Sequence, residues 1–343
     1  CKERNDMKVV DMHCDTIARI YEIRNQGEET GLGKNNLHLD LEKMQKGDYG
    51  LQNFALFVSL EREKRPFEYA MKLVDTFYGE MEKHQDWISP VTSYEDLERN
   101  WSQGKMSALL TIEEGGVCQG NLAYLRNFYR LGVRMMTLTW NYPNELGFPN
   151  YMNEDEAAMM GSTMGRPDTK RGLTETGIMF LEEMERLGMI IDVSHLNDAG
   201  IWDVFRYTEK PFVASHSNAR ALVPECPRNL TDEMIRELGN RGGVAGINYC
   251  IDFLHDPKDW RQGEKKKSLV ADMVRHMKHM RQIGGIGCIG LGSDFDGIGG
   301  ELEMSSGADL PLLEQEMRKE GFTQSEIEAV FYKNVLRVYR EVL

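Results

Sequence analysis

Residues of the types that bind metal ions stand at the ends of several strand-like apolar runs in this chain. His13 and Asp15 close the run that starts at Val9. Residues two apart on an extended strand point to the same side, so this pair offers an imidazole and a carboxylate to one object. Four further runs lead into the other candidates, which are Glu113 with Glu114, His195, His216 and Asp294. Imidazole and carboxylate suit zinc, and the shared position predicts a metal site at one end of a barrel.

Strand-like and helix-like segments alternate along the whole chain. Strands are expected at 9–13, 53–59, 108–112, 135–139, 189–193, 212–215, 244–248 and 286–292. Among the helical patterns between and after them, Thr174 can cap a helix that runs through Leu187 and stops at Gly188. Segments 267–282 and 324–343 have the pattern of long amphipathic helices. This alternation predicts an α/β protein with a (β/α)8 TIM barrel in a single domain, 1–343, and a doubly wound sheet is the alternative.

Two connections are long for such a barrel. They are 18–49, after the first expected strand, and 140–172, after the fourth. Both follow the carboxyl ends of strands, so both are expected over the catalytic C-terminal face as lid or pocket segments. For the first, extra packing turns are an equally good interpretation.

Composition restricts the class of protein and its partners. The chain has 343 residues, 41% of them hydrophobic, and a formal net charge of −14 from 55 acidic against 41 basic residues. This balance argues against a nucleic-acid or anionic-membrane surface. No uncharged run approaches the roughly 18 residues of a membrane span.

Six scattered cysteines do not form a disulfide framework, so we expect a cytoplasmic protein. Cys1 permits a lipid-anchored or exported form as a weaker alternative, and a homodimer is compatible with the sequence.

The motifs together resemble the renal (membrane) dipeptidase family of zinc metallopeptidases, in the amidohydrolase-like barrel group. In family order they are His13-Cys14-Asp15, Glu114-Gly115-Gly116, Asp192-Val193-Ser194-His195, Ser215-His216-Ser217, Arg228-Asn229 and Gly292-Ser293-Asp294-Phe295-Asp296-Gly297. The likeness spans nearly the whole chain. Each motif alone is weak, but the combination is specific.

The resemblance implies two zinc ions per chain. His13 and Asp15 would bind one, His195 and His216 the other, and a glutamate would bridge them. Glu114 is favoured as the bridge because it directly precedes Gly115-Gly116. Glu113 is the alternative, and its side chain should point to the opposite side of the strand.

The resemblance also implies roles for residues that do not bind metal. Asp294 would take a proton from the attacking water, present as a metal-bridging hydroxide, and pass it to the leaving amine; its alternative role is to cap a turn, for which Asp296 is the better candidate. Arg228 would grip the terminal carboxylate of the substrate, with a surface ion pair as its alternative. Asp192 would either orient the ring of a ligand or cap a loop.

One position departs from the family pattern. The mammalian renal enzyme carries a histidine near the scissile carbonyl where this chain has Trp140, which donates only through its indole N–H and carries no charge. Three outcomes are open: Trp140 forms a pocket wall that selects different side chains, another residue supplies the contact, or ordinary dipeptides are cleaved more slowly.

The expected function is a zinc-dependent dipeptidase of the membrane dipeptidase type that hydrolyses short peptides. Tolerance for a C-terminal D-residue is implied by the resemblance alone. The first alternative is an amidohydrolase acting on another amide, such as an N-acyl amino acid or a cyclic amide. The second is a metal-dependent binding protein without enzymatic activity.

The other histidines are not expected to bind metal. His276 and His279 lie three residues apart in a charged segment, which a solvated helix face explains. His84 and His255 lie in polar connecting sequence, and His38, in the first long connection, could approach the site.

Overall fold

The computed structural model describes residues 9–150, 166–256 and 266–343, and they form a closed barrel of parallel strands. Around the ring the order is β1-β2-β4-β5-β6-β7-β8-β10, and β10 pairs with β1 to close it. The bounds are β1 Val9–Asp11, β2 Tyr49–Phe57, β4 Met106–Glu113, β5 Val133–Thr137, β6 Ile190–Asp192, β7 Val213–Ala214, β8 Val244–Ile247 and β10 Ile289–Leu291. The predicted TIM barrel is confirmed, and the doubly wound alternative is excluded.

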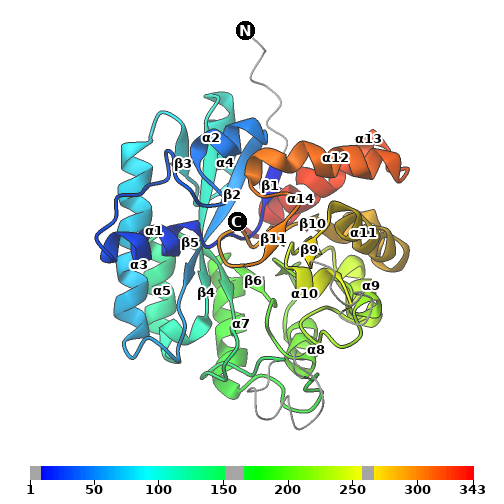
Figure 1. Ribbon diagram of the computed structural model, residues 1–343. Coiled ribbons are helices and arrows are strands. Elements are labelled where there is room, and N and C mark those ends of the chain that lie inside the picture. Colours follow the sequence, from blue (N-terminus) through cyan, green and yellow to red (C-terminus); the bar gives the residue numbers. More distant parts are fainter. Residues whose placement is uncertain (1–8, 151–165, 257–265) are drawn as a thin grey trace.

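Helices surround the strands, from α3 and α5 on one side to α9 and α11 on the other (Figure 1). The described helices are α1 Thr16–Asn25, α2 Leu41–Lys46, α3 Pro66–Lys83, α4 Tyr94–Ser102, α5 Leu122–Arg130, α7 Glu175–Leu187, α8 Asp198–Tyr207, α9 Asp232–Asn240, α10 Ile251–Leu254, α11 Val270–Gly284, α12 Leu310–Lys319, α13 Gln324–Glu328 and α14 Asn334–Val342.

The predicted helix after Thr174 is confirmed in detail. The Thr174 side chain accepts a hydrogen bond from the backbone N–H of Gly177, which satisfies a donor that the first turn of α7 leaves free. Gly188 ends α7 in the left-handed region at φ 74°, where a residue without Cβ meets little steric resistance. Strand β6 begins two residues later.

The core has an inner and an outer part. Inner strand residues, among them Leu51, Leu109 and Met135, pack inside the barrel with Val335, Val338 and Tyr339 of α14. The C-terminal helix therefore closes one end of the barrel, and the Asn53 side-chain amide donates to the Tyr339 hydroxyl at 2.6 Å. The larger outer part fills the space between strands and helices.

Several elements differ from the sequence expectations. Strand β1 ends at Asp11, so His13 and Asp15 lie beyond the regular strand. The first long connection holds α1 and α2, and much of the second lies outside the described residues. The helix expected at 324–343 is divided into α13, a π-helical turn at Ala329–Lys333 and α14. Three short strands were not expected: β3 Ile88–Pro90, which pairs with the start of β4, and the separate pair β9 Lys267–Ser268 and β11 Glu301–Leu302.

The solvated face expected for His276 is wrong. His276 is fully buried on α11, where its Nδ1 accepts from the backbone N–H of Ala219 and its Nε2 lies 3.0 Å from the backbone oxygen of Leu254. The buried ring thus ties α11 to the chain after β7 and to α10. His279 is partly exposed, and its Nε2 contacts Asp232 at 2.7 Å.

Candidate metal centre

The carboxylate of Glu113 lies at the centre of the site. Glu113 is the last residue of β4, and it has the same strand parity as Leu109, which faces the barrel interior. Its Oε2 lies 3.2 Å from His13 Nε2, and its Oε1 lies 3.1 Å from His195 Nε2 and 3.4 Å from His216 Nε2. One buried carboxylate therefore faces three imidazoles that come from three different parts of the chain.

Glu114 does not lie between the histidines, so its predicted placement is wrong. The backbone turns sharply at this residue, with φ 101°. Its side chain accepts from the backbone N–H of Gly116 at 2.7 Å and of Trp140 at 3.1 Å, and from the Asn144 amide. Glu114 therefore holds together the loops after β4 and β5, and Glu113 occupies the position expected of a bridging carboxylate.

His13 links two groups of potential ligands. The ligand atoms of His13, Glu113 and His216 lie within 4.8 Å of one another, and so do those of His13, Asp15 and Asp294. His13 Nε2 is 3.6 Å from Asp15 Oδ2 and 3.9 Å from Asp294 Oδ1. The ring of His13 stacks on that of His216 with centroids 3.9 Å apart, and neither of its buried nitrogens has a hydrogen-bond partner.

The hydrogen bonds of His195 and His216 fix which ring nitrogen faces the centre. The Ser215 hydroxyl donates to Asp192 Oδ2, so at 2.7 Å it accepts from His216 Nδ1. His195 Nδ1 donates to the side-chain oxygen of Asn141 at 2.9 Å. In both rings the lone pair is thus left on Nε2.

The donor set fits a metal ion. The two Nε2 atoms lie only 3.1 Å apart, and both face Glu113. Two lone pairs at this distance repel each other unless a cation lies against them. Burial, together with the charge of Arg228, lowers the pKa of His195 to about 4. A proton is therefore a poor cation for this position, whereas a metal ion needs the neutral imidazole.

The buried carboxylates of Asp15 and Asp294 also favour a bound cation. Burial raises the pKa of Asp15, and the neighbouring Glu113 carboxylate acts in the same direction. Burial likewise raises the pKa of Asp294. Buried carboxylates this close ionise together only when a cation compensates their charge.

Two aspartates position the ligand residues. Asp192 accepts from the backbone N–H groups of Ser194 and Ser215 and, through the Ser215 hydroxyl, orients the ring of His216. Asp11, at the end of β1, likewise holds the backbone next to a ligand residue: it accepts from the backbone N–H of His13 and from both the N–H and the hydroxyl of Ser293. The structure has both roles expected for Asp192: it caps the loop after β6 at the backbone N–H of Ser194, and it orients a ring, which is that of His216.

Asp294 and Asp296 have separate positions. Asp294 lies at φ 60°, and its Oδ2 accepts from the Asn248 side-chain amide at 2.9 Å. Asp296 accepts from the Thr16 hydroxyl and from the backbone N–H of His38, so it holds the turn together. His38 does approach this loop, where its Nδ1 accepts from the backbone N–H of Asp296.

Arg228 points to the same site from the loop after β7. Its Nη1 donates to the Ser217 hydroxyl at 2.6 Å and its Nη2 to the backbone oxygen of His216 at 3.1 Å. Its Nε is buried without a hydrogen-bond partner. Among the residues that the structure describes, no carboxylate lies within ion-pair distance of this guanidinium, so the expected alternative, a surface ion pair, does not form there.

Trp140 also lies beside the centre. Its ring centroid is 6.2 Å from that of His195 and 4.9 Å from that of Phe57, against which it packs edge-on.

Three supporting residues, Asn141, Asn248 and Asp11, were not predicted. Asp11 is the last residue of β1 and Asn248 directly follows β8, and this position was the available signal, whereas Asn141 lies four residues after the end of β5.

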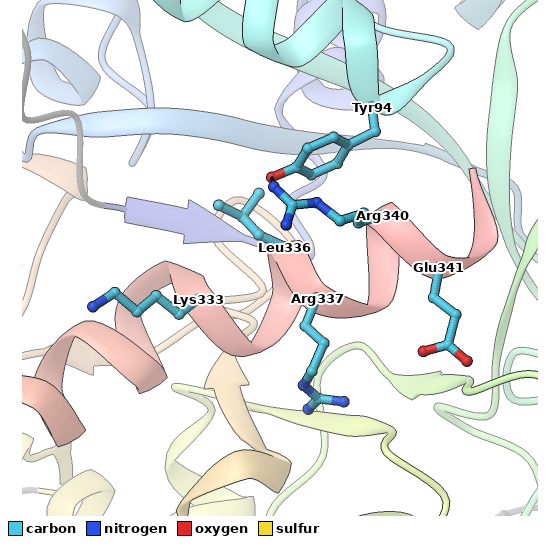
Figure 2. Close-up of a pocket in the computed structure, with 6 residues that line it drawn as sticks. All are labelled: Tyr94, Lys333, Leu336, Arg337, Arg340 and Glu341. Atoms are coloured by element: carbon cyan, nitrogen blue, oxygen red, sulfur yellow. Dashed lines mark hydrogen bonds between the residues drawn. The ribbon is translucent and has the colours of Figure 1, made fainter.

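A separate cavity of about 440 Å³ lies beside α14, lined by Tyr94, Lys333, Leu336, Arg337, Arg340 and Glu341 (Figure 2). The guanidinium groups of its two arginines already form hydrogen bonds with other groups of the protein. Arg340 donates to the Tyr94 hydroxyl, and Arg337 donates to the backbone oxygens of Gly242 and Gly287. The cavity contains none of the metal-ligand candidates.

The chain matches a known protein family over nearly its whole length. A family model described as membrane dipeptidase, peptidase family M19, matches residues 4–343. The chain belongs to this family. The membrane dipeptidase family comprises metallopeptidases, so membership assigns the chain to the hydrolases of dipeptidase type. No helix among the described residues is long and apolar enough to cross a membrane.

Several relatives of the membrane dipeptidase family are similar over most of their length. An uncharacterized dipeptidase of Schizosaccharomyces pombe is 30% identical over 355 residues, which cover 97% of this chain and 80% of the relative. The dipeptidase aclJ of Aspergillus oryzae is 29% identical and covers 89% of this chain and 70% of its own length.

Solved structures of the family have the same fold. The metallopeptidase named dipeptidase AC superposes with a TM-score of 0.86 at 26% identity, covering 97% of this chain and 98% of the other. A metallopeptidase from Rhodobacter sphaeroides, bound to a phosphinate mimic of the dipeptide L-Ala-D-Ala, superposes with a TM-score of 0.85 at 25% identity, covering 98% of this chain and 99% of the other.

Proposed function

We propose that this chain is a binuclear zinc dipeptidase that hydrolyses the peptide bond of dipeptides, including those with a C-terminal D-residue. The observation that carries the proposal is the convergence of His195 Nε2 and His216 Nε2 on the carboxylate of Glu113. In the proposed site, His13 and Asp15 hold one zinc ion, His195 and His216 hold the other, and Glu113 contacts both. Bound zinc supplies Lewis-acid chemistry, because it polarises a carbonyl and lowers the pKa of water.

The protein groups around the metal have distinct tasks in this proposal. Asp294 accepts the proton of the attacking water and delivers it to the leaving amine, as a buried carboxylate of raised pKa can do in turn. Its amide partner Asn248 keeps one oxygen occupied and leaves the other directed toward His13. Proton transfer is therefore assigned to Oδ1.

Arg228 is proposed to bind the terminal carboxylate of the substrate. Its planar fork of donors matches the two carboxylate oxygens, and the guanidinium has only neutral hydrogen-bond partners in the described structure. The Rhodobacter sphaeroides relative, which binds a mimic of L-Ala-D-Ala, supports the inclusion of C-terminal D-residues.

An N-acyl amino acid is the second candidate substrate. It also carries a carboxylate for Arg228, and the uncharged ring of Trp140 beside His195 suits an acyl chain.

Hydrolysis by the zinc-restored protein tests the proposal. The panel contains L-Ala-L-Ala, L-Ala-D-Ala, the corresponding dipeptide amides and N-acetyl-alanine. The proposal expects cleavage of the free dipeptides, with a strongly raised KM for the amides because Arg228 loses its partner. Cleavage of N-acetyl-alanine alone would favour the second candidate, and no cleavage of any dipeptide would contradict the proposal.

A further inference from the structure

Three aromatic side chains form one side of the candidate metal centre. The ring centroids of Phe57 and Trp140 are 4.9 Å apart, and those of Trp140 and Tyr142 are 5.8 Å apart. We call these three residues the aromatic wall. The wall reaches the metal-ligand residues through Trp140, whose centroid is 6.2 Å from that of His195.

Strand geometry turns Phe57 toward the mouth of the barrel. Phe57 is the last residue of β2, and its register partner in β4 is Glu113. Alternate residues of β2, Leu51 and Asn53, face the barrel interior, where they meet the residues of α14. Phe57 has the same parity. All three wall residues are partly exposed, so their rings can contact a substrate.

The wall and Arg228 lie on opposite sides of the mouth. In the ring order, β2, β4 and β5 are neighbours, and β7, β8 and β10 lie across from them. Phe57 ends β2 and Trp140 follows β5, whereas Arg228 follows β7 and donates to the backbone of His216. A dipeptide with its carboxylate on Arg228 and its scissile carbonyl beside Glu113 directs its N-terminal residue to the wall.

The wall has the chemistry of a site for flat apolar groups. Indole and phenyl rings bind other aromatic rings edge-to-face or offset. The Tyr142 hydroxyl donates to the Glu61 carboxylate at 2.7 Å, and this hydrogen bond holds the polar end of the side chain in place. We propose that the aromatic wall selects dipeptides whose N-terminal residue is aromatic. This inference rests on the proposed function, because it assumes a dipeptide held by Arg228.

The ratio of kcat/KM for Phe-Ala to that for Ala-Ala tests the inference. In the zinc-restored protein the expected ratio is about tenfold or more, as for a pocket that recognises a large apolar group. Trp140→Ala, and separately Phe57→Ala, should lower this ratio toward about one. Trp202→Ala is the matched control, since Trp202 is an exposed tryptophan on α8, and it should leave the ratio unchanged. A wild-type ratio near one, or an unchanged ratio in both wall variants, would overturn the inference.

A binding measurement separates the wall from the proposed function. Phosphinate mimics of Phe-Ala and Ala-Ala are titrated calorimetrically into the wild type and the Trp140→Ala variant. Tighter binding of the Phe-Ala mimic that is lost in Trp140→Ala supports the wall, even if no dipeptide is cleaved and the proposed function fails. Equal binding of both mimics to the wild type overturns the wall, even if dipeptides are cleaved.

Discussion

At the scale of single residues, the parity of one strand decides which glutamate faces the metal centre. Leu109 and Glu113 point into the barrel, whereas Leu110 and Ile112 pack on the outer side. The sequence could not fix this parity because both faces of a parallel barrel strand are buried and apolar. Thr111, the one polar residue within the run, shares the parity of Glu113 and was the only local signal.

Residues that bear the chemistry were easier to predict than those that support them. His13, His195 and His216 meet at one place, as their positions after separate strands suggested. The partners Asn141 and Asn248 were missed because a neutral amide after a strand is common, and only the folded loops show what it contacts.

Asp294→Asn tests proton transfer at this scale. The amide keeps the shape of the side chain and loses the ability to accept and return a proton. We expect kcat to fall by about 10² or more, while the zinc content measured by elemental analysis stays at the wild-type value. Asp296→Asn serves as a control for the turn. Nearly normal turnover in Asp294→Asn would remove this residue from the proton-transfer role.

At the scale of elements, the presence of each barrel strand was predictable and its ends were not. All eight expected runs correspond to barrel strands, because buried parallel strands are near-continuous apolar segments. β1 ends at Asp11, whose side chain accepts hydrogen bonds from the backbone N–H groups of His13 and Ser293, and no local pattern in the sequence marks this end. Strands β3, β9 and β11 have two or three residues each, too few to produce a periodic pattern.

The helix α11 yields a prediction about acid stability. Burial lowers the pKa of His276 to about 3, below its value of about 6.5 in an unfolded chain. Between these values the unfolded state binds one more proton, so this contribution to stability is complete above pH 6.5 and declines as the pH falls. The expected slope from this one group is about 1.4 kcal/mol per pH unit.

Urea unfolding of the metal-free protein between pH 7.5 and 5 measures this slope. His276→Gln retains a donor and an acceptor but does not titrate, so its free energy of unfolding should depend less steeply on pH. Parallel pH dependences in the wild type and His276→Gln would show that His276 is not buried in its neutral form.

At the scale of the whole molecule, the alternation of strands and helices predicted the barrel. It did not predict how the end of the barrel away from the metal centre is closed. The last segment was predicted to be an amphipathic helix. Its apolar residues Val335, Val338 and Tyr339 pack against the inner strand residues. Such a contact joins the end of the chain to segments far away in sequence, and no local pattern specifies the partner.

Tyr339→Phe tests the contribution of this closure. The hydroxyl accepts from the buried Asn53 amide at 2.6 Å, and its removal leaves that donor without its partner. We expect the free energy of unfolding to fall by about 1–3 kcal/mol, with little change in kcat because the bond lies at the end of the barrel away from the metal centre. Tyr124→Phe, on the outer helix α5, is the control, and an equal effect of the two substitutions would contradict this role of the bond.

Metal content of Glu113→Gln and Glu114→Gln tests the central claim most directly. Both proteins, and the wild type, are loaded with zinc, dialysed and measured by elemental analysis. Because Glu113 alone faces all three histidines, the wild type and Glu114→Gln should each retain about two zinc ions per chain, as in other two-metal hydrolases, and Glu113→Gln should retain one or fewer. Two firmly held zinc ions in Glu113→Gln would contradict the proposed metal centre.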